Sequence, residues 1–309
     1  METKATALAK NIEQVFVGKS EVVRNVLVAF LAGGHVLVED VPGVGKTVLA
    51  RALAKSVNCA FRRIQFTPDL LPSDILGVSV FNQAQDSFTF KPGPVFANVV
   101  LADEINRTTP RTQSSLLEAM NDFQVSMDGV TYTLPKPFVV IATQNPYEFE
   151  GTYALPENQL DRFLLCTRVG YPSPEDEKKV MADQKIVHPL DRLGAVMTTE
   201  EVVALQEEVK HVTVDDAISE YILRIVTATR RSEFLELGAS PRGSLHLYRA
   251  AQALAVTEGR SYVSPDDVKA LAPLVLAHRV RLAGPTRRRS SKDAEEVIRD
   301  LLDTVSVPI

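Results

Sequence analysis

The clearest pattern along the chain is a set of short apolar runs that each end in polar residues. The runs are His35–Val38, Asn98–Ala102 and Phe138–Ala142, and the polar residues after them are Glu39-Asp40, Asp103-Glu104 and Thr143-Gln144-Asn145. Continuous apolar runs of this length, alternating with helical patterns, predict strands of a parallel sheet that is covered on both faces. Ligands of such sheets sit at the carboxyl ends of the strands, so we expect these polar residues to meet at one edge.

A glycine-rich segment follows the first run. Residues 38–47 read VEDVPGVGKT, which matches the phosphate-binding motif G-x-x-x-x-G-K-[ST] everywhere except at its first glycine. Gly43 and Gly45 allow backbone N–H groups to turn towards phosphates. Lys46 can reach the outer phosphates, and the Thr47 hydroxyl can bind Mg²⁺.

Asp40 stands where the motif has its first glycine. A carboxylate that pointed into the loop would repel phosphates, whereas Asp tolerates turn conformations and can accept a local backbone N–H. We therefore expect the Asp40 side chain to face away from the ligand.

The segment after the loop has a helical pattern. Val48, Leu49, Ala52 and Leu53 fall on one face of a helix. The motif thus has the strand–loop–helix setting that phosphate binding requires, and a strand-to-helix turn without a ligand is the alternative.

Asp103 and Glu104 suit phosphoryl transfer to water, which needs a metal that neutralises phosphate charge and a group that orients or deprotonates the water. We expect Asp103 in the metal shell, directly or through water, and Glu104 at the water. A solvent-facing helix N-cap is the alternative for this pair. Asn145, which precedes Pro146, is expected to contact the water or the terminal phosphate, with turn formation as its alternative.

Composition fits a globular protein, since 45% of the 309 residues are hydrophobic and 24% are charged. The net charge of −5 argues against a generally basic nucleic-acid surface. Thr286–Lys292, which contains Arg287-Arg288-Arg289, is interpreted as a solvated loop between helices, with a phosphate- or nucleic-acid-binding patch as the alternative. Cys59 and Cys166 lack metal-ligand spacing, and no signal peptide or membrane span is indicated, so we expect a soluble, cytoplasmic protein.

The C-terminal part of the chain has helical patterns. Ser240 followed by Pro241 predicts a helix start, with Ser240 as the cap. Arg242 then lies at a helix end that suits anions, and a solvated first-turn arginine is the alternative. The predicted apolar faces are Leu245, Tyr248, Ala251 and Ala255 in one helix and Val297, Ile298, Leu301 and Leu302 in another.

Four stretches, in this order, resemble the MoxR family of AAA+ ATPases. They are QFTPDLLPSDILG at Gln65–Gly77, FKPGPVFANVVLADEINR at Phe90–Arg107, VIATQNPYEFEGTYALPENQLDRFLL at Val140–Leu165 and LAPLVLAHRV at Leu271–Val280. The family also resembles this chain in EDVPGVGKT, which includes Asp40. The resemblance implies an α/β fold, in which residues 1–171 form a P-loop NTPase αβα sandwich with a parallel sheet and residues 172–309 form a small all-α lid. The Pro-rich link Tyr171–Pro174 fits this boundary.

The resemblance further implies roles for single residues. Asn145 would be sensor 1, Arg162 the arginine finger offered to a neighbouring subunit, and Arg242 sensor 2. From the residues alone, Arg162 could equally pair with Asp161 or another carboxylate at the surface. Two hairpin insertions are implied, at Asp86–Lys91 and around Met127–Leu134. The implied ATP- or ADP-binding residues are Val17, Gly18, Gly43, Val44, Gly45, Lys46, Thr47 and Val48, with Val17 and Gly18 against the adenine, and Thr47 and Asp103 at Mg²⁺.

The expected function is ATP hydrolysis that drives movement between the large domain and the lid. The resemblance implies chaperone-like remodelling or maturation of partner proteins by a homo-oligomer, a hexameric ring, with a von Willebrand factor A domain protein as partner. A nucleotide-dependent assembly scaffold with little turnover is one alternative, and Glu104 counts against it. A helicase-like nucleic-acid motor is another, and the acidic total and the hairpin tip MDGVTYTL, which has no Lys or Arg, count against that.

Overall fold

The computed structural model describes residues 3–84, 86–146, 151–183, 189–284 and 291–308. Its centre is a five-stranded sheet in which all strands run parallel, in the order β2-β5-β8-β1-β9. The three apolar runs of the sequence form strands β5, β8 and β1, as predicted, and these three strands are neighbours in the sheet. The strands are β1 (Val36–Glu39), β2 (Phe61–Gln65), β5 (Val99–Asp103), β8 (Val139–Gln144) and β9 (Leu165–Thr167).

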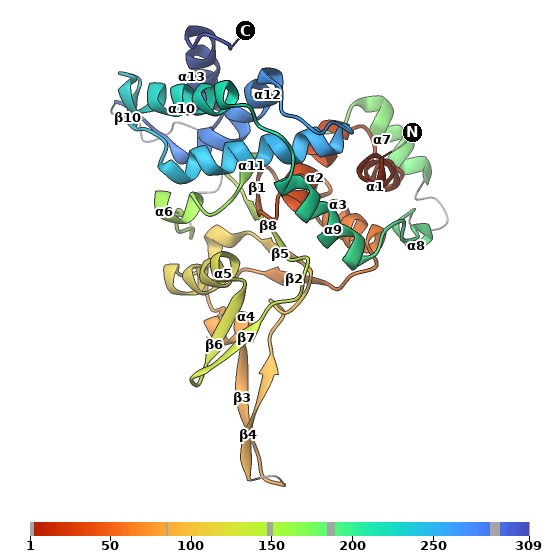
Figure 1. The fold of residues 1–309 in the computed structure, drawn as a ribbon. Helices are drawn as coiled ribbons and strands as arrows, with labels where there is room; N and C mark the ends of the chain where they lie inside the picture. Colours follow the sequence, from red (N-terminus) through yellow and green to blue (C-terminus); the bar gives the residue numbers. More distant parts are fainter. Residues whose placement is uncertain (1–2, 85, 147–150, 184–188, 285–290, 309) are drawn as a thin grey trace.

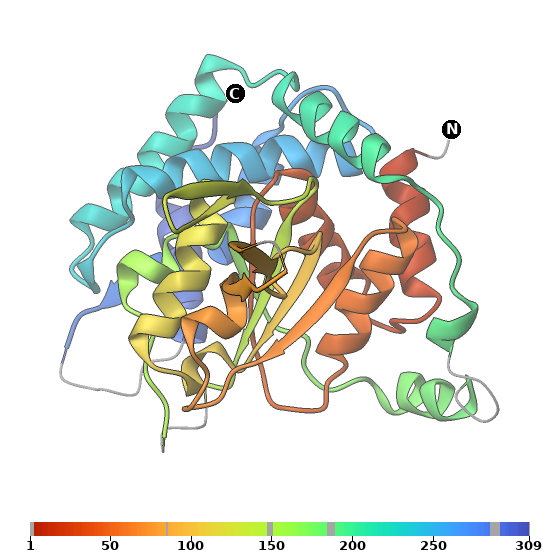
Figure 2. The same ribbon diagram turned by 90° about the horizontal axis from the view of Figure 1, so that it is seen from below.

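Side chains alternate along these strands between two apolar cores. Helices α1 (Lys4–Glu13), α2 (Ser20–Leu31) and α3 (Lys46–Ser56) share one core with the sheet, and α4 (Pro72–Leu76) and α5 (Pro110–Asp122) share the other (Figure 2). The αβα sandwich with two covered faces is therefore confirmed. In the central strands, Val99, Leu101, Val139 and Ile141 belong to the first core, and Val100, Ala102, Val140 and Ala142 to the second.

The chain after β9 is mainly helical and contains the lid, and most of its helices contribute to the first core, on the side of the sheet opposite α4 and α5 (Figure 1). It also contains one short antiparallel pair, β10 (Leu235–Leu237) with β11 (Arg281–Leu282), which is too short to give a periodic pattern in the sequence. None of the described helices combines the length and apolarity that a membrane crossing requires. The helices are α7 (Pro174–Asp183), α8 (Pro189–Arg192), α9 (Thr199–Lys210), α10 (Asp216–Arg231), α11 (Pro241–Thr257), α12 (Pro265–Leu276), η2 (Ala277–Arg279) and α13 (Ser291–Thr304).

Helix α11 begins as predicted, because the Ser240 side chain accepts the N–H of Arg242 at the cap. Its predicted apolar face is wrong at Leu245, which is 69% exposed. The buried side instead runs through Leu247, and two residues turn a helix by about 200°. Of the basic stretch Thr286–Lys292, residues 286–290 lie outside the described residues, and α13 begins at Ser291.

Two β-hairpins lie on the α4–α5 side of the sheet, and the first extends away from the body of the molecule (Figure 1). In the first, β3 (Gly77–Asn82) pairs with β4 (Ser87–Pro92), so it starts earlier than the predicted Asp86–Lys91. In the second, β6 (Gln124–Met127) pairs with β7 (Val130–Thr133). The rings of Phe90 and Tyr132 stack with centroids 4.2 Å apart, so the two hairpins support each other.

Candidate active site

The polar residues at the strand ends meet in one cavity of about 320 Å³. It lies where β1, β5 and β8 end, which is the edge predicted for a ligand. The structure thus brings together residues that are about a hundred positions apart in the chain. The cavity is lined by Asp40, Pro42, Gly43, Gly45, Lys46, Thr47, Arg63, Asp103, Glu104 and Asn145.

A larger hollow of about 640 Å³ lies between α10 and α13 in the lid. Its lining includes Arg224 and Arg231, but no glycine-rich loop and no paired carboxylates. Size alone therefore does not identify the site, and the chemistry of the smaller cavity is the better guide.

The loop between β1 and α3 needs its glycines. Gly43 and Gly45 have φ angles of 87° and 92°, in the left-handed region that glycine adopts without strain. Gly45 is also the residue before α3, so the free N–H groups and the positive dipole end of that helix lie at the cavity. The backbone by itself is therefore suited to phosphates.

The other residues predicted at the nucleotide lie in the loop, in the first turn of α3 and after Phe16. A Cβ at Gly45 would come within 3.2 Å of the Phe16 ring, which places the segment of Val17 and Gly18 beside the loop. Val44 and Val48 are partly buried against the first core. Contact of Val17 and Gly18 with adenine stays a prediction.

Lys46 is half-buried and donates a hydrogen bond from Nζ to the carbonyl oxygen of Asp40 at 2.9 Å. Burial lowers the pKa of its ammonium, and the carboxylates of Asp103, Asp40 and Glu104 act in the opposite direction. Phosphate oxygens in the cavity would favour the charged form further. An anionic ligand would therefore offset the effect of burial on the Lys46 ammonium and stabilise its charged form.

The Asp40 carboxylate accepts three backbone N–H groups, one of them local, as expected for Asp at this position. Its Oδ1 accepts the N–H of Val41 at 2.8 Å, and its Oδ2 accepts the N–H groups of Val169 at 2.7 Å and Gly170 at 2.6 Å. The last two donors follow β9, so the sequence pattern gave no sign of them. Asp40 thereby ties the phosphate loop to the segment that leads into the lid.

Asp103 is held from both neighbouring strands. Its Oδ2 accepts from Arg63 Nη2 at 2.6 Å, and its Oδ1 accepts from Thr143 Oγ1 at 2.7 Å. The side chain is largely buried yet lines the cavity. A carboxylate oxygen fixed in this way is suited to hold a metal ion directly or through water.

Glu104 follows β5 with φ 59° and ψ 48°, in the left-handed region. A residue other than glycine costs about 1–3 kcal/mol there, and such residues cluster at functional sites. Its Oε2 accepts from Gln65 Nε2 at 2.8 Å and lies 3.2 Å from Arg107 Nε. Glu104 occupies the N-cap position of the short 3-10 helix η1 (Ile105–Arg107), but its side chain makes no capping hydrogen bond there.

Sequence reasoning missed Arg63 and Gln65, which lie on β2 and bind the carboxylates of Asp103 and Glu104. This strand lies at the edge of the sheet and is mostly exposed, so it lacks the continuous apolar run that identified the central strands. Its only signal is that residues two apart, such as Arg63 and Gln65, share one face of a strand. That signal becomes useful only once β2 is known to pair with β5.

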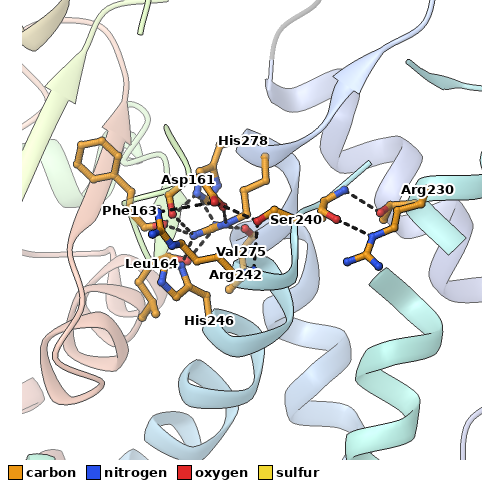
Figure 3. A network of polar contacts seen from close by, with 12 residues as sticks. Asp161, Phe163, Leu164, Arg230, Ser240, Arg242, His246, Val275 and His278 are labelled. Carbon is orange, nitrogen blue, oxygen red and sulfur yellow. Dashed lines mark hydrogen bonds and ion pairs between the residues drawn. The ribbon is translucent and has the colours of Figure 1, made fainter. Parts of the chain in front are cut away.

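Two predicted arginines are not among the residues that line the cavity of their own chain. Arg162 donates from Nη1 to the carbonyl oxygen of Leu117 at 2.6 Å rather than pairing with Asp161. Arg242 lies at the start of α11 with its Nη1 3.9 Å from Asp161 (Figure 3). Asn145, by contrast, lies in the cavity with the acidic pair.

Comparison with known proteins agrees with this geometry. The model of the ATPase family associated with various cellular activities (AAA) matches residues 35–165, and that of the AAA lid domain matches residues 227–301. The Bacillus subtilis protein YeaC is 52% identical over 97% of this chain and 93% of its own length. The chaperone MoxR1 of Mycobacterium tuberculosis is 43% identical over 96% of this chain and 80% of its own.

A solved structure agrees as well. The crystal structure of a protein from Cytophaga hutchinsonii matches this fold with a TM-score of 0.88 at 36% identity, and the match covers 99% of this chain and 95% of that one. A match of this extent includes both the sheet and the lid. The chain therefore belongs to the MoxR family of AAA+ ATPases.

Proposed function

We propose that the protein binds ATP with Mg²⁺ in the cavity at the ends of β1, β5 and β8, and hydrolyses it there. The observation that carries this proposal is the convergence of Lys46, Thr47, Asp103, Glu104 and Asn145 at the N-terminus of α3. A polyphosphate needs a cation, backbone N–H donors and a metal ligand, and this cavity offers all three.

The residues fit a magnesium ion. Thr47 and Asp103 line the same cavity and offer the hydroxyl and carboxylate oxygens that hold Mg²⁺ in P-loop proteins. The described residues contain no group of three or more Asp, Glu, His or Cys side chains that could hold a metal ion. Mg²⁺ does not require such a group, because it keeps several waters and binds phosphate oxygens. When bound, the ion neutralises phosphate charge.

The side chains divide the remaining work. Lys46 stabilises charge on the transferred phosphoryl group, and Glu104 orients the attacking water and takes its proton. Asn145 offers an amide to the water or the terminal phosphate. Gln65 and Arg107 set the direction of the Glu104 carboxylate, because both contact its Oε2.

The active form, we infer, is a ring of identical subunits, a hexamer by family resemblance. Arg162 is not among the residues that line the cavity of its own chain, and we propose that it acts on the cavity of a neighbouring subunit. An arginine delivered in trans is worth roughly 10³–10⁵ in rate. An isolated subunit should therefore bind ATP and turn it over slowly.

We propose that hydrolysis drives chaperone-like remodelling of partner proteins, including one with a von Willebrand factor A domain, through movement of the lid (172–309) relative to the large domain (1–171). One relative is named a chaperone. Phe81 and Phe88, exposed at 47% and 72% on the first hairpin, offer apolar contact to a client. The two free cysteines fit a reducing compartment, the cytoplasm.

The test is phosphate release from ATP with Mg²⁺, followed by client capture with the Glu104→Gln variant, which should hold ATP without turnover. A client that binds this variant with ATP and not Lys46→Ala supports remodelling. ATP binding without turnover in the wild type would favour the scaffold alternative. Turnover that rises with added DNA would favour the nucleic-acid motor.

A further inference from the structure

Asp161 is bound by the lid on both of its carboxylate oxygens. It ends helix α6 (Glu157–Leu160) and directly precedes Arg162. Its Oδ1 accepts from Arg279 Nε at 2.9 Å. Its Oδ2 accepts from Ser240 Oγ at 3.0 Å and lies 3.9 Å from Arg242 Nη1 (Figure 3). Three lid residues therefore converge on the residue before the predicted finger.

Arg279 binds the chain on both sides of Arg162. Its Nη2 donates to the carbonyl oxygens of Asp161, at 3.4 Å, and Phe163, and its Nη1 donates to that of Leu164 at 3.3 Å. The Arg279 side chain is only 1% exposed, so these contacts are shielded from water. One lid side chain thus fixes the backbone from which Arg162 extends.

The charges in this network make Asp161 the natural partner of Arg279. Burial lowers the pKa of Arg279 to about 10, and the Asp161 carboxylate opposes this, so the guanidinium is charged at neutral pH. Burial and the charge of Arg279 lower the pKa of His246 to about 3 and that of His278 well below its usual value. Both histidines are therefore neutral neighbours, and Asp161 is the carboxylate that balances the buried cation.

We propose that the Arg279–Asp161 pair positions Arg162, so that the lid of one subunit controls the finger that acts on the next subunit. This rests on the proposed action of Arg162 in trans. Ser240 and Arg242 also contact Asp161, so the start of α11 helps to fix the position of this residue. The rate in one cavity then depends on the lid of the adjacent subunit rather than only on its own lid.

The test uses mixed rings with two kinds of subunit. The finger donor carries Lys46→Ala, so its own cavity is inactive, and the cavity donor carries Arg162→Ala, so it offers no finger. Asp161→Asn, which keeps the side-chain shape and removes the charge, is placed in one kind of subunit at a time. In the finger donor it should lower the recovered turnover by about 10²-fold, the cost of a displacement of about 1 Å at a reacting centre. In the cavity donor it should leave the recovered turnover unchanged.

Arg279→Lys, which keeps the buried positive charge but loses the fork of carbonyl contacts, should show the same dependence on placement and covers the case in which Asp161→Asn folds poorly. Melting temperature and ATP affinity of each variant establish that it is folded. Equal losses in both placements, or a loss only in the cavity donor, would overturn the proposal, since a structural role would not depend on which subunit carries the change. Absence of recovery in the unmodified mixture would instead refute action in trans, and the positioning role with it.

Discussion

At the scale of single residues, the division of work between Lys46 and Glu104 gives the first prediction. Lys46→Ala should lose ATP binding, because it removes the cation at the phosphates. Glu104→Gln should keep ATP binding and lose turnover, because an amide cannot take a proton from water. Calorimetry and phosphate release measure the two effects separately. Normal hydrolysis by Glu104→Gln would show that Glu104 is not the base.

Asp40 gives the second prediction. Asp40→Gly restores the general motif and should change ATP affinity little, because the carboxylate binds backbone N–H groups rather than the ligand. The free energy of unfolding should fall by about 1–3 kcal/mol, since Val169 and Gly170 lose a buried acceptor. Calorimetry and denaturant unfolding measure the two quantities. A large loss of affinity at unchanged stability would contradict this assignment.

The glycine-rich motif and the polar residues at strand ends were enough to predict that the loop, the acidic pair and Asn145 meet at one place, because the carboxyl ends of parallel strands share one edge of the sheet. The partners of these residues were not predictable. Val169 meets Asp40 across 129 positions, and Arg279 meets Asp161 across 118. Such contacts depend on how the lid packs against the sheet, which no local pattern encodes.

At the scale of elements, the strands that the sequence predicted correctly are the buried ones. The central strands are buried on both faces and carry continuous apolar runs, whereas β2 at the edge does not. The hairpins were predicted through the family resemblance. The start of the first at Gly77 was missed, although Val78 and Val80 in β3 and Phe88 and Phe90 in β4 alternate with polar residues. The side of α11 was misjudged at Leu245 because a single exposed leucine looks like a core residue in the sequence.

His35 precedes β1 and gives a pH-dependent prediction. It is buried, its Nδ1 accepts the N–H of Val140 at 3.0 Å, and burial lowers its pKa from 6.5 to about 4. As pH falls from about 6.5 to about 4, the unfolded chain takes up a proton at His35 that the folded chain does not. The free energy of unfolding should therefore fall, by up to about 1.4 kcal/mol per pH unit from this residue.

The control for this prediction is His35→Gln, which retains a side chain able to donate and accept hydrogen bonds but does not titrate. Denaturant unfolding across the same pH range should show a shallower slope for the variant than for the wild type. His246 and His278 also have lowered pKa values and remain in both proteins, so the difference in slope reports His35 alone. Identical slopes would mean that His35 is protonated in the folded protein.

At the scale of the whole molecule, the cavity of one chain is lined by Lys46 and by the oxygens that we propose hold Mg²⁺, whereas Arg162 is not among its lining residues and donates to Leu117 instead. Turnover should therefore depend on assembly. Specific activity should rise with protein concentration until rings are complete, whereas ATP affinity per subunit should change less. Activity that stays constant across dilution to monomers would mean that one chain holds a complete site.

The most direct test of the central claim mixes two inactive variants, Lys46→Ala and Arg162→Ala. In a ring made of one variant only, every cavity lacks either the Lys46 ammonium at the phosphates or the Arg162 finger. Mixed rings contain interfaces where an intact Lys46 cavity meets an intact Arg162, and the account predicts that turnover returns there and depends on the mixing ratio. Full turnover by Arg162→Ala alone, or no recovery in rings shown to contain both variants, would contradict it.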